Sequence, residues 1–215
     1  MTNIDERTGQ PKIILDLCGG TGSWSRPYRE AGYDVRLITL PEYDVRTYAP
    51  PGNVYGVFAA PPCTEFSVAK TTAPRDLTAG LEIVRAVLEI IWGCQTKNKL
   101  AFWALENPRG LLVRFLGKPA FSFEQWEFGG RIEKPTCVWG QFKIPRKVTL
   151  DRPHIEKFRN KTSNRNLNSR EYASPKCPPE YSEHIAQIKG YKAKRAAIRA
   201  ITPAGFAEAF FKANT

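Results

Sequence analysis

Long apolar runs are absent from this sequence of 215 residues. No stretch approaches the roughly 20 apolar residues that a membrane-spanning helix needs. The first eleven residues are polar, carry Asp5 and Glu6, and lack the apolar centre of a signal peptide. Internal repeats and low-complexity tracts are also absent. We therefore expect a cytoplasmic protein of one domain, or of one domain with a small appendage, that does not enter a membrane.

The five cysteines form no C-x-x-C pair, and their number is odd. Such a set predicts neither a disulfide framework nor a common zinc motif. A zinc site made of Cys137, His154, Cys177 and His184 is a remote alternative, because these spacings match no common ligand pattern, and we expect no metal. The sequence also lacks the G-K-[ST] of a phosphate-binding P-loop.

Acidic residues are outnumbered by basic ones, and the formal net charge is +11. The excess is concentrated between Phe142 and Arg195, where 14 lysines and arginines stand against five aspartates and glutamates. A basic region attracts polyanions and accelerates encounters with them. This distribution predicts a nucleic acid as partner, and it leaves the rest of the chain nearly neutral, as expected of an enzymatic core.

The first two-thirds of the chain alternates short apolar runs with helical patterns. Strands are expected at 12–17, 34–40, 53–59, 100–105, 121–128 and 136–139. Helices are expected at 24–31, at 76–93 and, with a break near Thr202 and Pro203, at 194–212. This alternation predicts an α/β fold with a mostly parallel sheet and helices on both faces. Residues 143–189 lack clear periodicity and are expected to form a small, loop-rich, basic insertion.

Three unusual motifs fall where expected strands end. They are C-G-G-T-G (18–22), P-P-C (61–63) and E-N-P (106–108). Ligands of parallel sheets bind outside the carboxyl ends of the strands. Independent structural turns would be less expected to share one edge, so the coincidence indicates a single functional site.

Each motif also has a purely structural explanation. The glycine-rich turn lets a cofactor approach the backbone, and its alternative is a purely structural tight turn. Cys63, aimed by two prolines, could be a nucleophile or a small buried hydrophobe. Glu106 follows an apolar strand and is costly to bury without a function or a partner, such as Arg109.

Together and in this order, the motifs resemble the cytosine-C5 DNA methyltransferase family, specifically its short, phage-like members. D-L-C-G-G-T-G-S (16–23) resembles the cofactor-binding first motif, P-P-C-T-E-F-S (61–67) the catalytic loop, and A-L-E-N-P-R-G (104–110) the Glu-Asn motif. R-I-E-K-P-T-C-V-W-G (131–140) resembles the basic motif, and residues 195–207 resemble the C-terminal motif beside the cofactor. The resemblance covers most of the chain and implies a Rossmann-like S-adenosylmethionine-dependent methyltransferase fold in a bacterial or phage-infected cell.

The resemblance implies that Cys63 bonds to C6 of cytosine while Glu106 holds the base. The remaining implied catalytic residues are Asn107, Arg131 and Lys134. The implied contacts to S-adenosylmethionine are Asp16, Cys18, Gly19, Gly20, Thr21, Gly22, Ser23, Trp24, Leu40, Asp44, Val45, Pro61 and Arg199. The implied substrate is double-stranded DNA with an extruded cytosine, bound by a monomer.

The basic stretch is expected to hold DNA phosphates. The residues expected to bind nucleic acid are Ser67, Lys70, Arg146, Lys147, Arg159, Lys161 and Arg165. We expect residues 1–142 to form the catalytic and cofactor-binding core, 143–190 a reduced target-recognition region, and 191–215 a C-terminal helix returning to the core. Because about 45 residues is short for reading a long site, we expect a short or relaxed target sequence.

The sequence departs from the family at several positions. Thr64 replaces a glutamine, Cys18 an aromatic residue, and Arg199-Ala200 a Gly-Asn pair. A cation such as Arg199 beside a sulfonium is electrostatically unusual. It would suit a carboxylated cofactor derivative that donates an acidic group, such as carboxymethyl. Further alternatives are an RNA (tRNA) cytosine-C5 methyltransferase and a non-catalytic nucleic-acid-binding module. An N/D-P-P-[YF] loop of amino-methylating enzymes is absent.

Overall fold

A single six-stranded sheet organises the computed structural model, which describes residues 3–6, 9–68, 70–71, 73–97, 100–130, 134–151 and 177–215. Its strands lie in the order β2-β1-β3-β4-β6-β5. Their bounds are β1 Ile13–Leu17, β2 Asp34–Ile38, β3 Val54–Ala59, β4 Phe102–Pro108, β5 Phe121–Phe123 and β6 Thr136–Gln141. The first four strands are mutually parallel, whereas β6 is antiparallel to both β4 and β5. The predicted α/β architecture with a mostly parallel sheet is confirmed.

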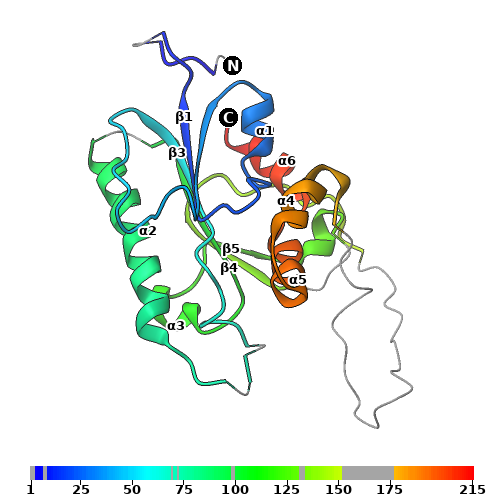
Figure 1. The fold of residues 1–215 in the computed structure, drawn as a ribbon. Coiled ribbons are helices and arrows are strands. Elements are labelled where there is room, and N and C mark those ends of the chain that lie inside the picture. Colours follow the sequence, from blue (N-terminus) through cyan, green and yellow to red (C-terminus); the bar gives the residue numbers. More distant parts are fainter. Residues whose placement is uncertain are drawn as a thin grey trace.

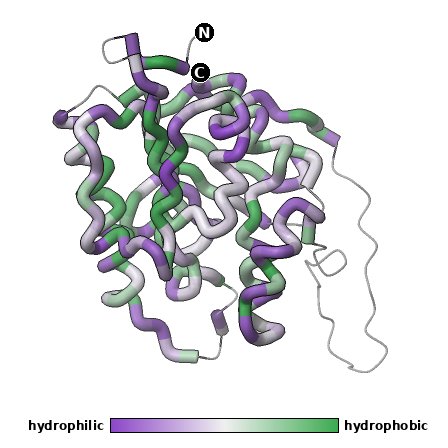
Figure 2. The backbone as a smooth tube through the Cα atoms, turned by 45° about the horizontal axis from the view of Figure 1, so that its top comes forward, coloured by the Kyte–Doolittle hydropathy of each residue, from purple (hydrophilic) through white to green (hydrophobic). Residues whose placement is uncertain are grey.

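Helices cover both faces of this sheet, as the sequence predicts (Figure 1). Side chains alternate along each strand, so Leu15 and Val57 belong to one hydrophobic core, and Ile14 and Phe58 to the other. Helix α2 (Leu77–Lys97) closes the first core, and α1 (Arg26–Glu30) and α6 (Ala204–Ala213) close the second. Hydrophobic segments accordingly run through the middle of the molecule in Figure 2. A sheet buried on both sides explains why its central strands read as continuous apolar runs.

Helix α2 begins where the sequence predicts and ends later. Its first turn is capped by Asp76, whose Oδ1 accepts a hydrogen bond from the amide of Ala79 at 2.9 Å. The helix continues past Gly93 to Lys97. Because Cys94 continues the buried stripe set by Ile91, packing against the sheet outweighs the helix-weakening effect of glycine.

The strand expected at 121–128 is wrong in its second half. β5 ends at Phe123, and Gln125–Phe128 forms the 3-10 helix η1. The cause is a capping box in which the side chains of Glu124 and Glu127 accept hydrogen bonds from each other's backbone amides. Gly129 then ends η1 in a left-handed conformation at φ 78°.

The C-terminal part of the chain is more helical than the sequence indicates. Residues 142–151 contain no helix or strand, as predicted, but η2 (Pro179–Tyr181) and α4 (Ser182–Gln187) lie within the range expected to be loop. Helices α5 (Tyr191–Ala200) and α6 are separated at Thr202 and Pro203, so the predicted break is confirmed. The remaining helix is the short α3 (Leu112–Leu116).

The second core is built mainly from aromatic rings, and Phe210 of α6 lies at its centre. The Phe210 ring is fully buried and lies 5.3 to 5.5 Å, between centroids, from the rings of Phe58, Trp24 and Phe102. These contacts attach the C-terminal helix to the sheet.

We expect Phe210→Ala to lower the free energy of unfolding by about 3–5 kcal/mol, because it removes a large buried ring and leaves a cavity. Urea denaturation followed by tryptophan fluorescence measures this change. Lys212→Ala, on the exposed side of the same helix, is the matched control and should change stability by less than about 0.5 kcal/mol. Equal effects of the two substitutions would contradict the role of α6 in this core.

Candidate active site

The strand order reverses direction between β1 and β3, because the chain passes from β1 to β2 on one side and reaches β3 on the other. Ligands of open α/β sheets bind at such a switch point, outside the carboxyl ends of the strands. Backbone hydrogen bonds from Cys18 to Ile38 and from Ala60 to Leu17 order the ends of these strands. The motifs that follow β1 and β3, and the motif that ends β4, therefore lie on one edge, as the sequence predicts.

The glycine-rich turn after β1 is folded over a buried carboxylate. Asp16 is 1% exposed, and its Oδ2 accepts a hydrogen bond from Ser25 Oγ at 2.5 Å. A Cβ on Gly19 would lie 2.2 Å from Asp16 Oδ1, so only glycine fits there. Burial raises the pKa of Asp16 to about 6, although Ser25 and Arg29 act against the rise. Asp16 Oδ1 has no hydrogen-bond partner within the described part of the chain.

Some residues of the turn lie at the strand-end edge, and others are buried in the core. Cys18, Gly20 and Gly22 take positive φ values of 57°, 55° and 67°. Ser23 is buried, and its Oγ accepts a hydrogen bond from the Thr202 amide at 2.8 Å, which ties the turn to the C-terminal segment. Trp24 is also buried, with its ring centroid 4.6 Å from that of Phe58. Its side chain therefore packs in the second core, whereas Thr21 is half-buried.

The segment after β2 supplies an exposed apolar side chain and a second carboxylate. Leu40 is 68% exposed, while Val45 is buried in the first core. Asp44 accepts hydrogen bonds from Arg46, whose guanidinium lowers the pKa of that carboxyl to about 2. Burial, together with the charges of Asp16 and Asp44, raises the pKa of the Cys18 thiol to about 12. Both carboxylates therefore act on the same turn.

These residues fit a ligand with cationic, hydrogen-bond-donating and apolar parts. The two carboxylates suit an ammonium, a sulfonium or an exocyclic amine, and the unpartnered Oδ1 of Asp16 is an acceptor without a donor. The exposed Leu40 could contact an apolar part of such a ligand. S-adenosylmethionine has all of these groups.

The loop after β3 is fixed to β4 by Asn107. This side chain is 1% exposed, and its Nδ2 donates to the carbonyl of Pro61 at 2.9 Å. Two residues further on, the carbonyl of Cys63 accepts hydrogen bonds from the amides of Phe66 and Ser67 at 3.0 and 2.8 Å. Cys63 itself is partly buried, and its side chain is not engaged in a disulfide.

Glu106 lies inside β4, one residue before Asn107, and not in a turn after the strand. Glu106, Asn107 and Pro108 pair with Val138, Cys137 and Thr136 of β6. The expectation that the strand ends at residue 105, before Glu106, is therefore wrong. Pairing to β6 satisfies the backbone of these residues and holds the carboxylate on a rigid strand instead.

Lys134 faces Glu106 across this edge, with its Nζ 3.6 Å from Glu106 Oε1. The two side chains are 15% and 18% exposed. Lys134 Nζ also donates to the carbonyl of Arg199 at 3.4 Å. Burial raises the pKa of the Cys63 thiol. The charges of Lys134 and Arg199 lower this pKa, and the charge of Glu106 raises it. The structure therefore brings together Cys63, Glu106, Lys134 and Arg199.

The expected nucleic-acid contacts are only partly described. Arg159, Lys161 and Arg165 lie outside the described residues, as does Arg131 of the expected catalytic set. Lys70 is bound by Glu65, and Lys147 Nζ donates to Glu127 Oε1 at 2.5 Å. Arg146 is exposed and Ser67 half-buried.

No protein-family model and no curated protein matches this chain.

Among the described residues, no group of three histidine, cysteine, aspartate or glutamate side chains could hold a metal ion, and His154 lies outside them. In the same part of the chain, no helix is long and apolar enough to cross a bilayer. Function is therefore inferred from the chemistry of the residues around Cys63.

Sequence reasoning assigned no role to Arg75. Its guanidinium donates to the backbone carbonyls of Glu65, Ser67 and Lys70, in the loop that follows Cys63. The arginine stands directly before the capping residue of α2, and no motif marks it. Its contacts depend on how the loop folds back, which no local pattern reveals.

The charges around Cys63 predict how fast its thiol reacts. Because the Cys63 pKa lies above its ordinary value, alkylation by iodoacetamide should still accelerate above pH 9. Lys134→Met removes a cation, raises the pKa further and should slow alkylation at pH 8 several-fold. Glu106→Gln removes an anion and should accelerate it.

Mass spectrometry of the Cys63 peptide measures these rates separately from those of the other cysteines. Lys118→Met, at an exposed lysine, is the control and should react like the unmodified protein. The same rate in Lys134→Met and Glu106→Gln would show that neither charge acts on the thiol.

Proposed function

We propose that this protein is an S-adenosylmethionine-dependent cytosine-C5 DNA methyltransferase in which Cys63 is the covalent nucleophile. One observation carries the proposal: a partly buried cysteine after β3 and a carboxylate in β4, about forty residues apart in the sequence, share one strand-end edge and act on each other electrostatically. A thiol and a carboxylate so placed can attack a pyrimidine ring and hold its polar edge at the same time.

In the proposed reaction, Cys63 gives its proton to solvent, and its thiolate sulfur bonds to C6 of the cytosine as the C5–C6 double bond opens. Glu106, protonated in this complex, donates a hydrogen bond to N3 and accepts one from the amino group, and so stabilises the electron-rich adduct. S-adenosylmethionine, when bound, would supply an electrophilic methyl group to C5 and leave as the thioether S-adenosylhomocysteine. A base, which can be water, then removes the C5 proton, the C5–C6 double bond reforms, and the Cys63–C6 bond breaks to release the thiolate.

Asn107 and Lys134 support this chemistry without forming bonds to the base. Asn107 holds Pro61, and so fixes the start of the Cys63 loop relative to β4. Lys134 lies 3.6 Å from Glu106 and so helps to position its carboxyl group, and its charge favours the thiolate of Cys63. The carboxylates at the β1 and β2 ends, Asp16 and Asp44, would hold the cofactor.

DNA is the proposed polymer because the target base must be extruded and the chain is strongly basic. Arg146, which lies within the range expected to recognise the target, is exposed. A cytosine in RNA presents the same ring, so RNA is the main alternative substrate. A non-catalytic binding module would need neither Cys63 nor Glu106.

A second candidate reaction is favoured by the position of Arg199. The carbonyl of Arg199 accepts a hydrogen bond from Lys134 Nζ at 3.4 Å, which places this residue beside Lys134. Its positive charge also lowers the pKa of the Cys63 thiol. An acidic transferred group, such as the carboxymethyl of a carboxylated S-adenosylmethionine derivative, would be stabilised there.

We expect the protein to form a covalent complex with double-stranded DNA containing 5-fluorocytosine in the presence of S-adenosylmethionine, because fluorine at C5 blocks the final elimination. A denaturing gel measures the shifted band. Cys63→Ala should abolish the band, whereas Cys177→Ala should retain it. Competition with unlabelled duplex DNA and with tRNA separates the two polymers. A band that persists in Cys63→Ala would refute the proposed nucleophile.

The same DNA product identifies the target and the transferred group. Bisulfite sequencing should place modified cytosines in a short or relaxed sequence, and a strict site of six base pairs would contradict this expectation. Nucleoside mass spectrometry should find 5-methylcytosine. If that product is found alone, even when the carboxylated cofactor is supplied, the carboxymethyl alternative is excluded.

A further inference from the structure

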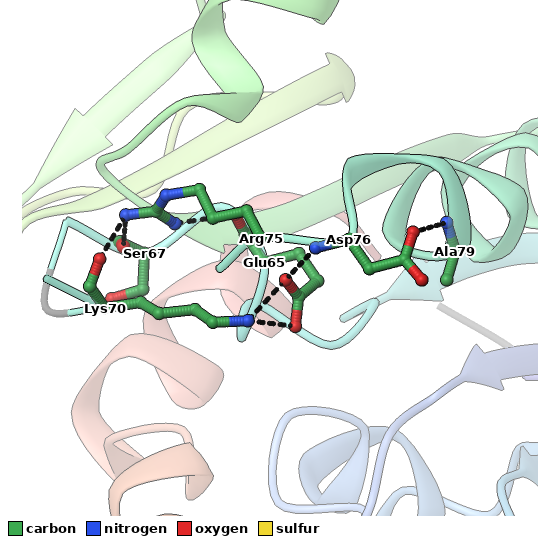
Figure 3. Close-up of polar contacts among 6 residues, drawn as sticks. All are labelled: Glu65, Ser67, Lys70, Arg75, Asp76 and Ala79. Carbon is green, nitrogen blue, oxygen red and sulfur yellow. Dashed lines mark hydrogen bonds and ion pairs between the residues drawn. The ribbon is translucent and has the colours of Figure 1, made fainter. Parts of the chain in front are cut away.

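The loop after Cys63 is held from inside by one guanidinium (Figure 3). Arg75 Nη1 donates to the carbonyl of Glu65 at 2.7 Å, and Nη2 donates to the carbonyls of Ser67 and Lys70 at 2.9 and 2.6 Å. These three carbonyls lie in a loop and not in a strand or helix ladder. A planar group with five N–H donors can serve several of them at once.

A carboxylate ties the same loop to the start of α2. Glu65 accepts hydrogen bonds from Lys70 Nζ at 2.8 and 2.6 Å and from the amide of Asp76 at 2.7 Å (Figure 3). Because Asp76 caps α2, and α2 is anchored in the first core by Val84 and Val87, this end of the loop is fixed to a rigid element.

The opposite side of the loop is docked on the chain just after β4. The amide of Leu111 donates to the carbonyl of Phe66 at 2.9 Å, and Ser67 forms an antiparallel bridge with Gly110. A Cβ on Gly110 would lie 2.3 Å from the Phe66 oxygen, so the close approach requires glycine. The Phe66 ring is fully buried.

These contacts converge on Cys63. Phe66 and Ser67, whose amides both donate to the Cys63 carbonyl, are the residues at the docked side of the loop. Arg75 donates to the carbonyl of Ser67, to that of Glu65 before the pair and to that of Lys70 after it. The position of Arg75 therefore sets the path of the backbone that orients Cys63.

We propose that Arg75 is a positioning residue for the Cys63 nucleophile, acting through the backbone carbonyls of Glu65, Ser67 and Lys70. This inference rests on the proposed function, because it assigns Arg75 a part in forming the bond between Cys63 and the base. Displacing a reacting group by about 1 Å can cost roughly 100-fold in rate. A residue that touches neither base nor cofactor would thereby control the rate of adduct formation.

The test compares Arg75→Gln and Arg75→Lys with the unmodified protein and with Arg85→Gln, an arginine of α2 whose side chain is 74% exposed. The rate constant for adduct formation is measured with 5-fluorocytosine DNA at saturating concentrations of DNA and S-adenosylmethionine. We expect a loss of roughly 10- to 100-fold in Arg75→Gln. Arg75→Lys should be intermediate, because an ammonium keeps the charge but not the planar fork. Arg85→Gln should match the unmodified protein.

A split between rate and affinity distinguishes positioning from a general structural defect. The half-saturating concentration of S-adenosylmethionine should change less than twofold in both Arg75 variants, since the carboxylates proposed to hold the cofactor, Asp16 and Asp44, lie at the end of β1 and after β2, away from the contacts of Arg75. An unchanged adduct rate in Arg75→Gln, or equal losses in rate and in cofactor affinity, would overturn the proposal. Thermal unfolding of each variant shows whether it is folded. If Arg75→Gln does not fold, the comparison is made with Arg75→Lys instead.

Alkylation of Cys63 by iodoacetamide separates this inference from the proposed function. It needs neither DNA nor cofactor, and loosening the loop in Arg75→Gln should accelerate it at least twofold relative to Arg85→Gln. If the unmodified protein forms no adduct, the methyltransferase proposal fails, and the alkylation rates still decide whether Arg75 orients Cys63. Identical alkylation rates in the two variants would refute that role.

Discussion

The hydrogen bond from Asn107 to the Pro61 carbonyl is the constraint on which the candidate site depends. It joins the loop after β3 to β4. It therefore fixes Cys63, which follows the two prolines, relative to Glu106, which precedes Asn107. A buried hydrogen bond of this kind adds only about 1 kcal/mol to stability. Its larger effect is geometric, because it removes the freedom of the loop to move away from the strand.

Opposite charges divide the strand-end edge into two parts. Asp16 and Asp44 act on the glycine-rich turn, whereas Lys134 and Arg199 act on Cys63. The C-terminal segment connects the parts, since Thr202 donates to Ser23 of the turn and the Arg199 carbonyl accepts from Lys134. The α5–α6 junction thus stabilises both sides of the site, which explains why α6 must be attached firmly to the sheet by its aromatic residues.

The sequence predicts most of the fold because the strands are short apolar runs and the sheet is buried on both faces. β1, β3 and the start of α2 follow directly from that pattern. The second half of the expected strand at 121–128 fails because the reciprocal hydrogen bonds of Glu124 and Glu127 outweigh its apolar, aromatic composition. The extent of β4 is underestimated because β6 continues the pairing through Glu106 and Asn107. Long-range pairing of this kind leaves no local signal.

For the site, residues adjacent to strand ends are predictable, and contacts between distant segments are not. The sharing of one edge by Cys18, Cys63 and Glu106 follows from parallel topology alone. The approach of Lys134 to Glu106, the tie between Ser23 and Thr202, and the three carbonyls held by Arg75 depend on how loops fold back. Trp24 adjoins the turn in sequence, but its size and apolarity place its ring in the core.

Burial of Cys63 has two opposing consequences for the proposed reaction. It raises the pKa of the thiol, so the free protein holds mainly the protonated and less oxidisable form at neutral pH. A thiolate of higher pKa is also the stronger intrinsic nucleophile once the proton has left. Lys134 and Arg199 oppose this rise in the pKa and so reduce the cost of forming the thiolate. The surroundings of the thiol therefore favour reaction with a ring held against Glu106 over reaction with oxidants in solution.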